Sequence, residues 1–375
     1  MPDTEKNAAA HRKGAPVPLP FYLSMTANIY AQAVATSGLE GAKHLALAQE
    51  TAARLQDMLD GIAAWKTHPH RRYAPDHPIL WQRGSTSLRD FGKVGDLPVL
   101  IIPSLINGPE ILDLSPDRSF LASFTDAGLR PIVLDWGYPG RDDRSLSLSC
   151  YVSDRLLPAL NWATSELGDT ALLGYCLGGP LAIAAAQLAE RKPTRIALIG
   201  APWDFSAIEG IAQALTASVQ ADGGEATRRS LQEMGKSLGA VPPDLFQSLF
   251  ALLAPMQAAR KFRRFAKMDQ ACPKAETFVA VEDWLNSGPA VAAPAAEELL
   301  VDWYALNAPA HGAWQCGGKV IDPGLVDVPT LAIVGKRDHI APPKAACPLA
   351  KALPNATCVE GRSWPCGHDR RGARP

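Results

Sequence analysis

Five short apolar runs divide the middle and late parts of the chain. They occupy residues 98–102, 131–135, 170–174, 195–200 and 329–335. Runs of this length without polar interruption are typical of strands buried on both faces of a parallel sheet. Stretches with helical spacing lie between them, at residues 119–127, 151–167 and 179–189. The alternation predicts the α/β class: a doubly wound, mostly parallel sheet with right-handed crossovers.

Two regions outside this alternation have helical patterns. Residues 21–65 carry an apolar stripe at three- and four-residue steps, which includes Leu45, Leu55 and Ile62. Residues 206–310 interrupt the strand pattern, and insertions between sheet strands commonly cover a site at the strand ends. We therefore expect a helical cap there. Its helices are predicted at residues 208–219, 228–238, 244–265 and 295–306.

These patterns predict a division of the chain into five parts. Residues 1–20 form a flexible tail, and residues 21–96 form an N-terminal helical segment and a linker that includes an edge strand. The core of the sheet begins with residues 97–205 and ends with residues 311–375. The helical cap, residues 206–310, separates those two parts of the core.

Composition and charge narrow the function classes. Of 375 residues, 47% are apolar and 20% charged, which is typical of a folded protein with a sizeable core. A net charge of −1 gives no electrostatic reason to expect nucleic acid as a partner. No apolar run reaches the ~18–20 residues of a membrane span, and the start of the chain lacks the apolar stretch of a secretory signal. The seven cysteines form no CxxC pair or zinc motif, so we expect reduced thiols, no metal and a cytoplasmic protein.

The strongest chemical signal is the stretch Gly174-Tyr175-Cys176-Leu177-Gly178. It follows a predicted strand and opens a predicted helix, which is the setting of the nucleophile elbow, with cysteine in place of serine. Glycines flank the nucleophile because side chains there would collide with neighbouring backbone. The helix N-terminus favours a thiolate, so we interpret Cys176 as an ionised nucleophile. The alternative is a small buried cysteine on a glycine-rich turn.

A nucleophile of this kind needs a base, and the base needs an orienting acid. In this fold the chain order is nucleophile, acid, histidine. Asp338, after the last predicted strand, is the expected acid, with a turn carboxylate as the alternative. His368 is the histidine in the expected window for the base. The expected oxyanion hole combines the N–H of Leu177 with that of Ile106 or Leu105 in the loop after the first core strand.

Four further stretches accompany the cysteine-bearing box in a fixed order. They are residues 98–107 with 111–114, then Asp-Trp-Gly-Tyr-Pro at 135–139, Pro-Trp-Asp-Phe at 202–205, and Asp-His-Ile-Ala-Pro-Pro at 338–343. In combination, over residues 97–343, these motifs resemble the polyhydroxyalkanoate synthase family of the α/β-hydrolase superfamily. The Asp-Trp-Gly-Tyr-Pro stretch and the modest length are most similar to the shorter synthases that work with a second subunit.

The resemblance implies an acyltransferase with an α/β-hydrolase core and a helical cap. Cys176 would carry the acyl group, Asp338 would be the acid and a late histidine the base. The implied reaction moves a 3-hydroxyacyl group from coenzyme A to Cys176 and then to the hydroxyl end of a growing polyester. It needs no separate cofactor, because coenzyme A arrives as the substrate's thioester. Implied partners are a second synthase subunit or a second copy of the chain, in the cytoplasm or at a polyester granule surface.

The C-terminus departs from the family pattern. The family's last catalytic residue lies in a Gly-His-Ile/Val-Gly stretch that a helix follows. Here residues 361–375 are arginine-rich and have neither strand nor helix periodicity. We therefore expect a truncation or a shift of the reading frame near Glu360, in which case His368 matches the base only by accident.

Two other functions remain open on the sequence alone. One is a thioesterase or esterase that uses the same three residues, and the other is an inactive, granule-associated interaction protein. Further residues have both a functional and a packing interpretation. An acyl tunnel or the packing of the cap would explain the aromatic residues Trp284, Trp303 and Tyr304. A phosphate or granule-surface site, or a solvated helix face, would explain the basic residues Arg260, Lys261, Arg263 and Arg264. Turn or cap roles fit Asp135 and Asp204.

Overall fold

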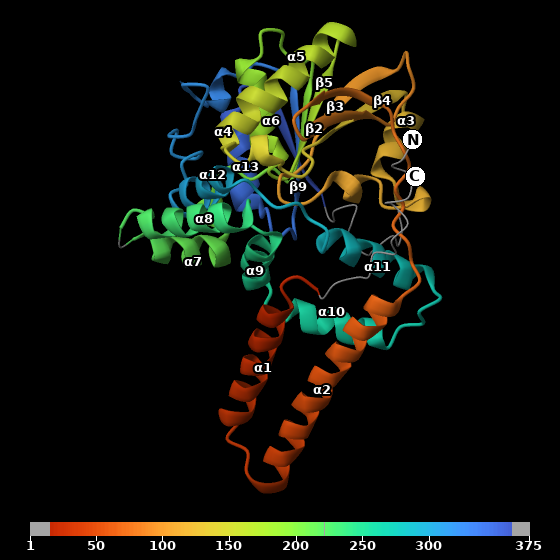
Figure 1. Cartoon of the computed structure of the whole chain (residues 1–375), viewed down its shortest axis with the longest axis vertical. Coiled ribbons are helices and arrows are strands. Elements are labelled where there is room, and N and C mark those ends of the chain that lie inside the picture. Colours follow the sequence, from red (N-terminus) through yellow and green to blue (C-terminus); the bar gives the residue numbers. More distant parts are fainter. Residues whose placement is uncertain (1–15, 221, 362–375) are drawn as a thin grey trace. The chain divides into compact units, whose positions relative to one another are not determined.

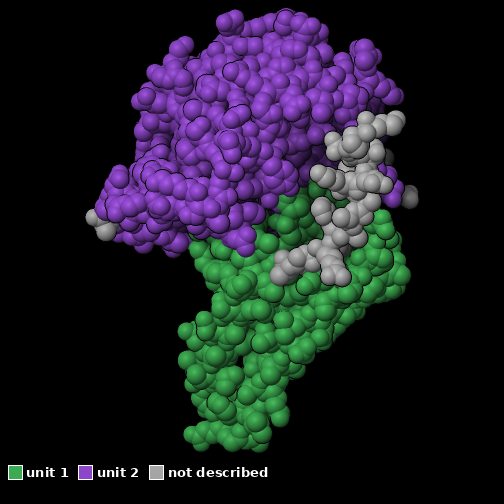
Figure 2. Space-filling view, viewed as in Figure 1, with its two compact units in different colours: residues 1–72, 247–287 green, residues 73–246, 288–375 purple. Residues whose placement is uncertain are grey.

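The chain divides into two compact units. The computed structural model describes residues 16–220 and 222–361. Unit 1 comprises residues 1–72 and 247–287, and unit 2 comprises residues 73–246 and 288–375. Figure 2 colours unit 1 green and unit 2 purple. Each unit is built around its own set of elements.

Unit 2 contains a mostly parallel sheet, labelled in Figure 1. Its strand order is β1-β2-β4-β3-β5-β6-β9-β10. The six strands β4, β3, β5, β6, β9 and β10 run parallel, whereas β1 pairs antiparallel with β2 and β2 pairs antiparallel with β4. The expected α/β class with a doubly wound sheet is confirmed. The strands are β1 (Ile79–Arg83), β2 (Thr86–Asp90), β3 (Leu97–Ile102), β4 (Leu129–Asp135), β5 (Ala171–Tyr175), β6 (Ile196–Ile199), β9 (Thr330–Gly335) and β10 (Ala356–Gly361).

The five strands predicted from apolar runs are β3, β4, β5, β6 and β9. Residues 98–102 of β3 are all buried, as expected for a strand covered on both faces. Helices that pack along the sheet include α3 (Phe120–Asp126), α5 (Leu157–Glu166) and α6 (Gly178–Leu188). Helix α13 (Pro343–Ala352) packs on β9 and β10 at the other edge. Strand β10 has a largely exposed side-chain pattern, so no apolar run indicated it.

The predicted insertion at residues 206–310 is shared between the units. Val241 and Val291 pair as an isolated bridge in unit 2, with N–H···O distances of 2.8 and 2.9 Å. The chain therefore leaves and re-enters unit 2 at one point, and residues 247–287 belong to unit 1. Unit 2 keeps α7 (Glu209–Val219), α8 (Glu225–Leu238), α12 (Ala293–Glu297) and a π-helix over Glu298–Ala305.

The single helix predicted over residues 244–265 is wrong. The structure has two helices, α9 (Pro243–Leu253) and α10 (Gln257–Ala266), with Pro255 between them. Proline lacks the N–H that a continuing helix would need, and its ring clashes with the preceding turn. The period of apolar residues continues across the break, which is why the sequence pattern did not show it.

Unit 1 is helical and has its own core. It contains α1 (Leu19–Ala35), α2 (Gly41–Thr67), α10 and α11 (Pro273–Leu285). Two polar contacts connect its helices to α11. The indole N–H of Trp65 in α2 donates to Asp283 at 2.9 Å, and the ammonium of Lys261 in α10 pairs with the buried carboxylate of Glu282 at 2.7 Å. No helix of the described residues is long and apolar enough to span a bilayer. The core includes Met58, Ile62 and Trp65 of α2, Phe262 and Phe265 of α10, and Val279 of α11.

The stripe predicted along residues 21–65 is buried only at its end. The pattern is divided between α1 and α2, which are separated by a turn where Gly38 has a φ of +64°. Ile62 is buried, whereas Leu45 is 58% exposed. In the basic stretch of α10, Phe262 lies in the core of unit 1 and Arg263 lies 3.8 Å from Asp57.

A tryptophan anchors the loop that follows β3. Trp136, directly after β4, is 4% exposed, and its indole N–H donates to the carbonyl of Pro103 at 3.1 Å. Its ring meets that of Tyr151 edge to face, with centroids 5.5 Å apart. A buried carbonyl without a donor is costly, so this bond fixes where the loop starts.

We expect the substitution Trp136→Phe to lower the free energy of unfolding by about 1–3 kcal/mol, because it keeps an aromatic ring but leaves the carbonyl of Pro103 without its donor. Urea unfolding followed by circular dichroism measures the change. The matched control is Trp81→Phe on the edge strand β1, where we expect a smaller loss. Equal losses in the two variants would contradict the anchoring role of Trp136.

Candidate active site

Cys176 occupies a strained position between a strand and a helix. It follows β5 directly, and α6 begins two residues later. Its φ is +54°, in the left-handed region that few residues other than glycine adopt. Its N–H donates to the carbonyl of Ile199 at 2.9 Å, and its own carbonyl accepts from Gly179 at 2.9 Å. This strand–turn–helix geometry is that of a nucleophile elbow.

The glycines around Cys176 permit the close packing of the elbow. A Cβ on Gly178 would lie 2.0 Å from the carbonyl oxygen of Ile102, at the end of β3. A Cβ on Gly174 would lie 2.5 Å from the Cα of Gly179. Real Cβ atoms are not found at such distances from backbone. The prediction that side chains at Gly174 and Gly178 would collide with backbone is confirmed.

The described residues around Cys176 oppose the predicted ionisation of its sulfur, which stays a prediction. The pKa of the Cys176 thiol is raised to about 11, mainly by burial and in smaller part by the charge of Asp338. Hydrogen bonds from the backbone of Leu177 and the side chain of Ser104 act in the opposite direction. Loss of hydration therefore outweighs these two hydrogen bonds, and this balance opposes ionisation of the thiol.

Ser104 is a site residue that the sequence analysis did not single out. It lies in the loop after β3, is buried, and its hydroxyl hydrogen-bonds the sulfur of Cys176. Its oxygen also accepts the N–H of Ile106 at 3.4 Å. The backbone N–H of Leu177 also donates to the sulfur of Cys176. The roles of Leu177 and Ile106 as oxyanion donors stay predictions. The signal available in the sequence was that Ser104 is the one hydroxyl residue in residues 103–108.

Asp338 lies at the same edge of the sheet as Cys176. It follows β9, and its charge acts on the thiol of Cys176. One carboxylate oxygen accepts the backbone N–H groups of Ile340 at 2.8 Å and Ala341 at 2.9 Å. The other lies 3.6 Å from the position of a Cβ on Gly200, so it faces the end of β6. Asp338 therefore shapes its own turn and also faces the site, and the turn role does not exclude the role of the acid.

The predicted base, His368, lies outside the described residues. The last residue described before it is Gly361, at the end of β10. Gly361 pairs with Gly335, and its carbonyl accepts the N–H of Lys336 at 3.1 Å. The chain thus leaves β10 at the carboxyl ends of the strands. Asp338 lies at the same end of the sheet, because it follows Gly335 by three residues. His339, next to the acid, is exposed on the loop.

Tyr304 lies near Cys176, and Trp303 packs behind it. Burial raises the pKa of Tyr304, and the charge of Cys176 raises it further. The ring of Phe205 lies 5.0 Å from that of Tyr304 and 5.2 Å from that of Trp303. Trp303 is fully buried. These contacts agree with the packing interpretation of Trp303, while Tyr304 belongs to the wall of the site.

Asp135 and Asp204 have turn and cap roles, as expected. Asp135 accepts the N–H of Gly137 at 2.9 Å, and Asp204 accepts the N–H of Ser206 at 3.2 Å. Asn307 donates to Asp204 at 2.9 Å. Among residues 16–220 and 222–361, no group of three or more His, Cys, Asp or Glu side chains is placed to hold a metal ion.

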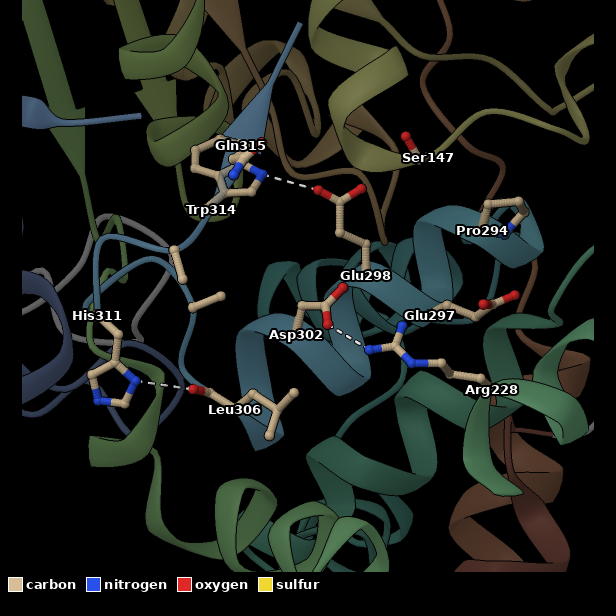
Figure 3. A pocket seen from close by; sticks show the side chains of 12 residues that line it. Ser147, Arg228, Pro294, Glu297, Glu298, Asp302, Leu306, His311, Trp314 and Gln315 are labelled. Carbon is tan, nitrogen blue, oxygen red and sulfur yellow. Dashed lines mark hydrogen bonds and ion pairs between the residues drawn. The ribbon is translucent and has the colours of Figure 1, made fainter. Parts of the chain in front are cut away.

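Unit 2 has a cavity of about 570 Å³, and neither Cys176 nor Asp338, the two predicted catalytic residues that the structure describes, lines it. Figure 3 shows the ion pair of Arg228 with Asp302, at 2.6 Å, and the bond from Trp314 to Glu298, at 2.9 Å. Burial raises the pKa of Glu298. Polar groups that line this cavity thus pair with one another.

Comparison with known proteins places the chain in a family. A family model described as the alpha/beta hydrolase fold matches residues 98–363. The chain is 31% identical over 277 residues to a Haloferax mediterranei protein named poly(3-hydroxyalkanoate) polymerase subunit PhaC, covering 72% of this chain and 55% of that protein. A protein of the same name from Synechocystis sp. is 29% identical over 275 residues, covering 72% of each chain.

The chain spans about half the length of the archaeal relative and about three quarters of the cyanobacterial one. A solved hydrolase structure from Pseudomonas aeruginosa matches 78% of this chain and 92% of its own, with 18% identity and a TM-score of 0.44. The family model covers more than half of the sequence, from the second residue of β3 to beyond the end of β10. The chain therefore belongs to the alpha/beta hydrolase fold family, and it has homologues that are named poly(3-hydroxyalkanoate) polymerase subunits.

Proposed function

We propose that this chain is an acyltransferase that polymerises 3-hydroxyacyl groups from coenzyme A thioesters, with Cys176 as the acyl carrier. The observation that carries the proposal is a cysteine at the elbow, with a φ of +54° and hydrogen bonds to its sulfur from Leu177 and Ser104. The names of the homologues support the substrate class. Their designation as subunits supports a second subunit as partner.

The chemistry of the thiol suits acyl transfer. The sulfur of Cys176 attacks the thioester carbonyl, coenzyme A leaves as its thiol, and the acyl group remains on Cys176 as a new thioester. Because one thioester replaces another, the exchange is nearly balanced and the acyl group stays transferable. The hydroxyl end of the polyester then attacks this thioester and releases Cys176. Buried aromatic residues at the site, such as Tyr304 and Phe205, keep water away from the acyl group.

The proposed reaction depends on a base because the pKa of Cys176 is about 11. At pH 7 such a thiol is ionised in only about one molecule in 10⁴. A histidine that accepts the proton of Cys176 and hydrogen-bonds to Asp338 would generate the thiolate. We propose His368 for this role, and the carboxylate oxygen of Asp338 that faces the end of β6 supports the acid's part in it.

We expect Cys176→Ala to abolish release of coenzyme A from 3-hydroxybutyryl-coenzyme A, with a loss on the order of 10³-fold or more, because the acyl acceptor is gone. A thiol-independent assay of coenzyme A, such as chromatography, measures it. The matched control is Cys150→Ala, another free thiol of unit 2, which should keep the activity.

The products separate the proposal from its alternatives. Polymer together with free coenzyme A supports the acyltransferase. Free 3-hydroxybutyrate without polymer supports the thioesterase. If the wild-type chain releases no coenzyme A, alone or with a second synthase subunit added, the proposal fails and the interaction protein is favoured.

We expect the reactivity of Cys176 with iodoacetamide to depend on His368. Without the base, the alkylation rate should rise about tenfold per pH unit from pH 7 toward 11, since burial raises the thiol pKa and only the thiolate reacts. In the wild-type chain we expect a rate at pH 7 at least about tenfold above that of His368→Ala. Peptide mass spectrometry of residues 156–191 measures the rate. Superimposable pH profiles for the two chains would remove His368 from the mechanism.

A further inference from the structure

Two cysteines outside the candidate site face each other between a helix and a strand. Cys347 lies in α13 and is partly buried, and Cys358 lies in β10 and is exposed. Their thiols hydrogen-bond each other. Neither residue belongs to the elbow or to the groups around Asp338.

The connection between the two elements explains why the thiols meet. Helix α13 ends at Ala352 and β10 begins at Ala356, so the chain turns back on itself within a few residues. Cys347 lies five residues before the end of the helix, about 7.5 Å along its axis. Cys358 lies two residues after the start of the strand, about 6.6 Å along it. The two residues are therefore at nearly the same height in the unit.

The register of the sheet directs Cys358 toward the helix. Cys358 pairs with Ala332 of the parallel strand β9, and paired residues of neighbouring strands face the same side of a sheet. Ala332 is only 4% exposed, and α13 packs on β9 and β10. The position of Cys358 at the last strand of the described sheet also leaves its sulfur open to solvent.

We propose that Cys347 and Cys358 are a redox-modification site, which hydrogen peroxide converts into a reversible disulfide. The exposed thiol of Cys358 loses its proton and its sulfur attacks one peroxide oxygen. The O–O bond breaks, Cys358 becomes a sulfenic acid, and the hydroxide that leaves takes up the proton and becomes water. The thiol of Cys347 then attacks that sulfur, the S–S bond forms, and the sulfenic oxygen leaves as a second water. Each sulfur gives up one electron, and the peroxide takes up both. A dithiol reverses the reaction by thiol–disulfide exchange.

Charges near the pair agree with this order of attack. Burial raises the pKa of Cys347, and Cys358 and Glu360 raise it further, while Lys351 lowers it. Glu360 itself lies 3.5 Å from the ammonium of Lys336. The raised pKa of Cys347 suits the resolving partner of such a pair.

The disulfide joins two elements at the rim of the candidate site. Helix α13 follows the loop of Asp338, and β10 ends at Gly361 beside Gly335. Oxidation therefore fastens the last described strand to the helix that packs on it. The modification leaves the thiol of Cys176 unchanged.

The test treats the full-length chain with one equivalent of hydrogen peroxide, alkylates the remaining thiols with N-ethylmaleimide and digests with trypsin. We expect one cross-linked pair of peptides, residues 345–351 with 352–362, two hydrogens lighter than their sum and lost after dithiothreitol. Its yield should exceed that of any other cysteine pair roughly tenfold, since neighbouring groups react at high effective concentration.

Variants and competing products decide the outcome. Cys347→Ser and Cys358→Ser should each abolish the cross-link, whereas Cys272→Ser, a free thiol of unit 1, should preserve it. A bridge from Cys358 to Cys366 in peptide 363–370 would overturn the proposal. Oxidation of Cys358 to sulfinic acid with Cys347 still free would overturn it as well. The wild-type result needs no variant, so a poorly folded variant does not leave the proposal undecided.

Discussion

The site depends on the close approach of two backbones where α6 begins. Gly178 lies directly against the carbonyl of Ile102, and no side chain fits between them. This contact forces the chain to turn sharply after β5, and Cys176 takes up the turn with a φ of +54°. The strain places the sulfur where the ends of β3, β5, β6 and β9 converge. Ser104, Tyr304 and Asp338 can therefore act on the same atom although they lie far apart in the sequence.

The same close packing creates the chemical problem that the site has to solve. A sulfur surrounded by protein loses hydration, and burial raises the pKa of the thiol to about 11. Two hydrogen bonds do not reverse that effect, and the neighbouring carboxylate of Asp338 opposes ionisation. A proton acceptor is therefore more important here than in a site where the helix N-terminus alone ionises a cysteine. Limited access of water to the sulfur would also suit the proposed transfer, because hydrolysis would release the acyl group.

The core of the fold was predictable because its signal is local. Five buried strands are continuous apolar runs, and the elbow is a contiguous motif, so both can be read from neighbouring residues. Strand β10 was not predicted because its side chains are largely exposed. The break between α9 and α10 was not predicted because the apolar period continues across Pro255. The attachment of residues 247–287 to unit 1 rests on contacts such as Trp65 with Asp283, 218 residues apart, which no local pattern contains. The raised pKa of Cys176 likewise comes from burial by distant segments rather than from its motif.

The central claim is that the sulfur of Cys176 carries the acyl group, and the mass of the enzyme after brief exposure to substrate tests it most directly. The wild-type chain is mixed with 3-hydroxybutyryl-coenzyme A, quenched in acid within the first turnover, and digested. We predict that the peptide of residues 156–191 gains one 3-hydroxybutyryl group, that hydroxylamine removes it, and that the adduct is located on Cys176. Turnover of the thioester with that peptide unmodified, or with the acyl group on another residue, would contradict it.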